Sequence, residues 1–140
     1  MITEDYVSFE IAKLLKEKGF DWSCEHKFVD PEDTVHENAF PLFTNCVDKD
    51  GFPDTGKNSE FEGYRYSAPT LQMTMKWLRE VHKLEISLNH DAIQENHNWW
   101  YEIEKYTKGC ISILHESGSD YSTYENACEA AIKYCLENLI

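Results

Sequence analysis

Six histidines and five cysteines are the side chains of this chain that could hold a metal ion or act as nucleophiles. Two groups have a spacing that suggests a metal site: Cys24 with His26, which would share one face of a strand, and His90, Asp91 and His97, which lie close in sequence. A structural zinc site uses four Cys or His ligands at characteristic spacings, and neither group supplies four. The sequence leaves metal binding by either group open, and we predict no cofactor.

Thiol catalysis requires a cysteine beside a histidine, and Cys110 or Cys128 with His115 are the candidates. No local motif accompanies them, since the chain has no GxSxG, no phosphate-cradling glycine loop and no dinucleotide fingerprint. We therefore predict no catalytic residues and expect a non-enzymatic protein. An enzyme whose site is built from loops is an alternative hypothesis.

Two pairs of carboxylates have spacings that could also do chemistry. Glu102 and Glu104 would share a strand face, but beside Lys105 they are typical of solvated surface. Asp48 and Asp50 have part of the spacing of a calcium loop, yet the closing position, which requires a bidentate Glu, is a lysine here. The second pair predicts a turn stabilised by aspartate side chains.

The most informative cluster is aromatic: Trp99, Trp100 and Tyr101 lie in the alternating segment NWWYEIEKY. Alternation sends Trp99 and Tyr101 to one side of a strand and Trp100 to the other. One side is core, and the other is covered by the N-terminal half, by a partner or by a second copy of the chain. Trp100 is therefore a candidate interface residue, and Trp77, which widens the apolar stripe of a helix, is a second.

The formal net charge of −13 restricts the partners of the chain. Nucleic-acid binding needs Lys and Arg to displace counterions from phosphates, and an anionic membrane surface is disfavoured for the same reason. We therefore expect no nucleic acid and no membrane as partners. A basic protein or a cation would be a more natural partner.

Periodicity predicts an α+β fold, with a small, mainly antiparallel sheet and helices packed on one face. We expect a single domain over 1–140, in which a helix–strand segment with a long loop (1–66) precedes an αβββα unit (67–140). The expected elements are helices at 3–19, 67–83 and 121–140 and strands at 20–29, 84–90, 98–106 and 110–114.

The αβββα order of 67–140 resembles the topology of double-stranded-RNA-binding domains. Those domains need a lysine cluster at the start of the last helix, where this chain has Glu125 and Asn126. The same half holds six Lys or Arg against eleven Asp or Glu. A nucleic-acid-associated module is thus an alternative hypothesis that rests on topology alone.

The beginning of the chain, MITEDYVSFE, is acidic and lacks the basic and apolar regions of an export signal. The number of cysteines is odd and no pair forms CxxC, which favours reduced thiols. Both observations predict a cytoplasmic protein.

Three phrases, FEIAKLLKEKGFDW, YSAPTLQMTMKWLREVHKLEI and YSTYENACEAAIKYCLENLI, carry a resemblance to a family. They resemble an uncharacterised family of small acidic proteins from gut anaerobes of the Bacteroides type and their phages. The resemblance implies a bacterial cytoplasmic origin and a link to a mobile element, and it implies no activity and no functional residues. We expect an interaction or regulatory protein that binds a protein partner or itself.

Overall fold

The computed structural model describes residues 5–30, 41–91 and 98–140. These residues form two compact units, an N-terminal unit over 5–70 and a C-terminal unit over Leu71–Ile140. The α+β class is confirmed, although the strands form two three-stranded antiparallel sheets in place of one small sheet. The unit boundary lies close to the segment boundary expected after residue 66, and a single domain stays a prediction.

The N-terminal unit packs one helix with a sheet of order β2-β1-β3. Its elements are α1 (Phe9–Glu17), β1 (His26–Val29), β2 (Leu42–Asn45), the 3-10 turn η1 (Asn58–Glu60) and β3 (Arg65–Ser67). A helix is predicted from residue 3, but among the described residues α1 begins only at Phe9. Tyr6 instead forms an antiparallel β-bridge with Thr70. Ser8 caps α1, and its hydroxyl accepts a hydrogen bond from the Ile11 amide. Ser8 satisfies a donor that the first helical turn leaves unpaired.

One buried amide ties the distant parts of the N-terminal unit together. The Asn58 side chain donates to the Phe20 carbonyl and accepts from the Ser67 amide, each at 2.8 Å. Next to it, Ser59 donates to the Asp21 carboxylate through its amide and its hydroxyl, and these bonds lower the pKa of Asp21. The polar segment before β3 is therefore anchored to the end of α1 rather than being a free surface loop.

The calcium-like stretch forms the aspartate-stabilised turn that the sequence predicts. One carboxylate oxygen of Asp48 accepts from the amides of Asp50 and Phe52, each at 2.9 Å. The carboxylate is thus used within the turn, as aspartate commonly is at this position.

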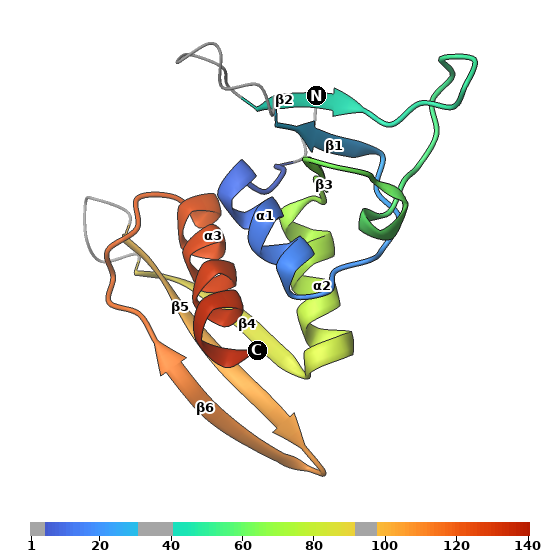
Figure 1. The fold of residues 1–140 in the computed structure, drawn as a ribbon. Coiled ribbons are helices and arrows are strands. Elements are labelled where there is room, and N and C mark those ends of the chain that lie inside the picture. The colour runs from blue at the N-terminus through green and yellow to red at the C-terminus, as the bar shows by residue number, and fades with distance from the viewer. Residues whose placement is uncertain (1–4, 31–40, 92–97) are drawn as a thin grey trace. The chain divides into compact units, whose positions relative to one another are not determined.

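The C-terminal unit has the predicted αβββα order (Figure 1). Its elements are α2 (Leu71–His82), β4 (Leu84–Asp91), β5 (Asn98–Thr107), β6 (Cys110–Glu116), α3 (Tyr124–Tyr134) and a terminal π-helical turn η2 (Cys135–Leu139). The strands form an antiparallel sheet of order β4-β5-β6. Thr123 caps α3 by accepting from the Asn126 amide.

The two faces of this sheet differ in what covers them. Helix α3 packs on the covered face, where Tyr101 and Ile103 are buried and the His115 ring stacks on Tyr134 at 3.7 Å. Helix α2 packs beside α3 and against β4. Because strand residues alternate, the other residues stand on a second face that neither helix covers, which we call the open face. The open face comprises Glu85, Ser87, Asn89, Asp91, Asn98, Trp100, Glu102, Glu104, Tyr106, Ile111, Ile113 and Glu116.

A β-bulge decides which residues of β6 reach the open face. Ile103 pairs with His115, but the next residue, Glu104, pairs with Ile113, so Leu114 is an extra residue on β6. The bulge places His115 on the covered face and Ile113 on the open face, although residues two positions apart in a regular strand share a face. Figure 1 shows the β5–β6 hairpin extending past the end of α3.

Two isoleucines of this sheet provide a matched test of the assignment of faces. Ile103 is fully buried, whereas Ile113 is 60% exposed. We expect Ile103→Ala to lower the free energy of unfolding by about 2–5 kcal/mol, because it removes buried methyl groups and leaves a cavity. Ile113→Ala should change it by less than about 0.5 kcal/mol. Urea unfolding followed by circular dichroism measures both, and equal losses would contradict the division into covered and open faces.

Candidate interaction surface

The two tryptophans of β5 point to opposite faces, as the alternation predicts. Trp99 lies on the covered face, where its ring meets Tyr124 edge-on at 5.4 Å and its backbone bridges Tyr121. Trp100 lies on the open face opposite Asn89. Both side chains are half-buried, so Trp99 is less enclosed than its buried neighbour Tyr101.

The second candidate interface residue, Trp77, is an interior residue. It is 3% exposed, and its ring packs edge-on against His82 at 4.7 Å. Trp77 falls on the same buried stripe of α2 as Thr74 and Leu78, which is why it offers no surface to a partner. Of the two candidates, Trp100 alone contributes to the open face.

The candidate metal ligands that the structure describes make other contacts. The Cys24 thiol donates to the Trp22 carbonyl, and the His26 ring stacks on Phe43 at 5.0 Å. The His90 ring lies 4.7 Å from that of Trp99, and His97 lies outside the described residues. Within 5–30, 41–91 and 98–140, no three His, Cys, Asp or Glu side chains are grouped so that they could hold a metal ion.

A hollow of about 520 Å³ in the N-terminal unit brings a thiol, an imidazole and carboxylates together. It is lined by Glu25, His26, Asn45, Cys46, Pro53, Asp54 and Thr55. Burial raises the pKa of the Cys46 thiol, so the thiol is protonated at neutral pH and is a poor nucleophile. The hollow therefore lacks the activated group that thiol catalysis needs.

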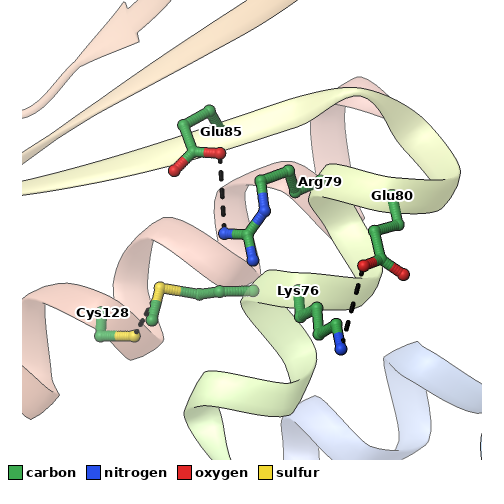
Figure 2. A network of polar contacts seen from close by, with 6 residues as sticks. Lys76, Arg79, Glu80, Glu85 and Cys128 are labelled. Carbon is green, nitrogen blue, oxygen red and sulfur yellow. Dashed lines mark hydrogen bonds and ion pairs between the residues drawn. The ribbon is translucent and has the colours of Figure 1, made fainter.

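Neither thiol considered as a candidate partner of His115 has the geometry or the reactivity of a nucleophile paired with that histidine. Cys110 and His115 lie five residues apart on β6, roughly 16 Å at the rise of a strand. Cys128 is buried on α3, where its sulfur contacts that of Met75 at 3.5 Å (Figure 2). Burial raises the pKa of Cys128 to about 12, so this thiol stays protonated.

Carboxylates gather on the open face. Glu104 pairs across the strands with Glu85, and Glu102 pairs with Glu116. A hydrogen bond with Glu116, followed by burial and repulsion from Glu116 and Glu104, raises the pKa of Glu102. Lys105, which the sequence placed beside the pair, lies on the other face.

Cations reach only one end of this carboxylate cluster. Arg79 of α2 lies 3.7 Å from Glu85 (Figure 2). Among the described residues, no Lys, Arg or His lies within ion-pair distance of Glu102, Glu104 or Glu116. These three carboxylates are therefore an unneutralised negative patch, which we call the acidic patch.

Strand β6 is an edge of the sheet with apolar, exposed side chains. Ile111 and Ile113 are each 60% exposed and Leu114 is 40% exposed. In the part of the chain that the structure describes, β6 pairs with β5 alone, so its outer row of amides and carbonyls has no strand partner. Soluble proteins usually protect such an edge with charges, proline, a β-bulge or a covering element, and of these β6 has the bulge at Leu114. Apart from this bulge the edge is open and apolar, and an open edge beside an acidic patch has the features of a surface that binds another chain.

The sequence predicts β6 as a strand but not its exposure. The segment CISIL predicts a strand that forms a hairpin with the strand before it, and the prediction does not say what covers its apolar side chains. One feature of the sequence points to the edge position. A strand that follows its neighbour through a short turn pairs with that neighbour, and no later strand is available to pair with its other side.

Comparison of the chain with protein-family models, curated proteins and solved structures gives no match. The resemblance to a Bacteroides-type family stays a prediction. None of the helices described is both long and apolar enough to cross a membrane.

The cysteines supply a direct test of these surfaces. Cys110 is exposed, whereas Cys24, Cys46, Cys128 and Cys135 are buried. Burial raises the pKa of Cys24, Cys128 and Cys135 to about 12. We expect one thiol to react rapidly with Ellman's reagent at about pH 8, and all five to react after denaturation without reductant.

The variant Cys110→Ser identifies the reactive thiol, because it should abolish the rapid phase and leave four slow thiols. A rapid phase that persists in this variant would show that one of the four is accessible. A total below five in denatured wild type would reveal a disulfide.

Proposed function

We propose that this protein is a non-enzymatic interaction protein that binds another protein through β6 and the adjoining open face. The observation that carries the proposal is the edge strand Cys110–Glu116, of which every residue except His115 is exposed. A partner strand pairing with this edge would satisfy its backbone groups and cover Ile111, Ile113 and Leu114. This mode of recognition needs no deep pocket.

The opposite edge of the sheet is a weaker candidate. The side chains of β4 are buried or half-buried along most of the strand, and those on its open face are polar. Of its two carboxylates there, Glu85 already has Arg79 as a partner, and Asp91 lies at the far end of the strand. Apolar surface is thus available to a partner at β6 rather than at β4.

The enzyme alternative has less support, because the candidate thiols other than Cys110 are buried and kept protonated. The nucleic-acid alternative is disfavoured by electrostatics. The acidic patch lies on the sheet face left free by the helices, and the first turn of α3 carries Glu125. Either feature would repel phosphates.

The free thiols support a reducing compartment, in agreement with the proposed cytoplasmic location. Within that compartment we place the protein as a regulatory partner, and its link to phages or other mobile elements is part of the proposal. That link rests on the family resemblance of the sequence.

Selection from a display library of random peptides tests the proposal without a known partner. We expect wild type to enrich extended peptides, and Ile113→Lys to lower their capture by at least about tenfold, because a charge in an edge strand opposes strand addition. Val81→Lys is the matched control, since Val81 is a half-exposed aliphatic residue of α2. Equal capture by all three proteins would overturn the assignment to β6.

Duplex RNA separates the proposal from its topological alternative. A labelled duplex of about 20 base pairs is longer than the roughly 16 that a double-stranded-RNA-binding domain spans. At physiological salt we expect a dissociation constant no tighter than about 1 µM by fluorescence anisotropy. Tighter binding that weakens steeply with salt would favour the nucleic-acid module.

A further inference from the structure

We infer that the partner of β6 is a basic extended segment, with Lys or Arg at alternate positions, that adds to the sheet as a fourth strand. The inference rests on the proposed function and specifies its ligand. It combines two independent features of the C-terminal unit, the unpaired apolar edge of β6 and the acidic patch formed by Glu102, Glu104 and Glu116.

The register of the sheet sets which side chains an added strand would meet. Such a strand would lie about 4.8 Å from β6 and about 10 Å from β5. On the open face its neighbours on β6 would be Ile111, Ile113 and Glu116, with Glu104 behind Ile113 and Glu102 behind Glu116. Each carboxylate of β5 is thus one strand further from the partner than a residue of β6.

This arrangement suits a long side chain with an apolar stem and a charged end. A Lys or Arg beside Ile113 can lay its methylene groups over the isoleucine and carry its charge to Glu104. A second basic residue beside Glu116 would meet that carboxylate directly, with Glu102 behind it. A short basic or neutral side chain could cover Ile113 but could not reach β5.

The charges of the free protein also favour a basic segment as the partner of β6. Glu102 has a raised pKa because of its bond with Glu116 and the crowding by Glu116 and Glu104. A cation brought to the patch would relieve this repulsion, and charge-assisted hydrogen bonds to carboxylates are among the stronger polar contacts. The partner therefore gains from charge as well as from backbone pairing.

A second copy of the chain fits the edge less well. Each copy carries a net charge of −13, so association brings two strongly negative chains together. Pairing two β6 strands would also extend one sheet that carries both acidic patches, without supplying a cation to either. A second copy and a basic segment could both form backbone hydrogen bonds with β6, but only the basic segment would neutralise the acidic patch.

Three seven-residue peptides, matched to the length of β6, test the inference. They alternate Val with Lys, with Gln or with Glu, and each is labelled for fluorescence anisotropy. We expect the Lys peptide to bind wild type at least about tenfold more tightly than the Gln peptide at low salt, and the Glu peptide to bind most weakly. The preference should shrink as salt screens the charges.

Charge removal on the acidic patch is the decisive variant. Glu102→Gln with Glu116→Gln should reduce the preference for Lys over Gln peptide to less than about threefold, while binding of the Gln peptide persists. The matched control is Glu80→Gln with Glu137→Gln, which removes the same charge from exposed helical positions of the same unit and should keep the preference.

Protection of Cys110 reports where the peptide binds. Cys110 is the first residue of β6 and is exposed, so a bound strand should slow its reaction with a thiol reagent. We expect at least about tenfold slower labelling with saturating Lys peptide, as occupancy by mass action requires. In Ile113→Lys the same peptide concentration should leave the labelling rate unchanged.

The outcomes separate the inference from the proposed function. Equal binding of Lys and Gln peptides that Ile113→Lys abolishes would overturn the basic ligand and keep strand addition at β6. Concentration-dependent dimerisation by light scattering, lost in Ile113→Lys and without peptide binding, would assign the edge to a second copy. Absence of peptide binding, Cys110 protection and dimerisation together would overturn both.

Discussion

The structure of the C-terminal unit depends on one constraint: its helices pack on a single face of the β4-β5-β6 sheet. That face must supply the whole apolar core of the sheet, and the alternation of strand residues then sends Glu102 and Glu104 outward. The burial of Tyr101 and Ile103 and the position of the half-buried Glu102 and Glu104 on the opposite face have the same cause. The acidic patch is thus a direct result of covering a sheet on one side.

The sheet also explains why apolar residues remain exposed. Three strands and two helices leave β6 at an edge, and the β5–β6 hairpin continues past the end of α3 (Figure 1). Ile111 and Ile113 on this arm have no helix to cover them and are 60% exposed. Charge on the neighbouring strand opposes the association of two such arms and, by the proposal above, also selects the partner.

Local patterns predicted most of the C-terminal unit. The strands expected at 84–90 and 98–106 are observed as Leu84–Asp91 and Asn98–Thr107, because alternation over many residues is a strong signal. The first helix begins six residues later than expected, at Phe9 rather than at residue 3, since Tyr6 pairs with Thr70, which is distant in sequence. Such long-range pairings leave no mark on local periodicity.

The candidate surface was predicted only in part for the same reason. Trp100 was placed on the correct side of its strand, whereas Trp77 was expected at an interface and is buried. The crowding of Glu102 and Glu116 depends on the register of two strands, and one sequence does not give that register. The edge position of β6 depends on which strands fail to pair, which is also a property of the whole sheet.

The bulge at Leu114 allows the residues on the open face of β6 to change without a change in the buried core. If β6 slid by one residue so that Leu114 entered the ladder opposite Glu104, Ile113 would oppose Lys105, and Ile111 and Ile113 would turn to the other face of the arm. Deletion of the Cys110 codon, at the turn end of β6, would favour this slide and would replace the two isoleucines by Ser112 and Leu114 on the open face, with the pair of His115 and the buried Ile103 kept. Related chains could diverge in their partners through such insertions and deletions while keeping one core.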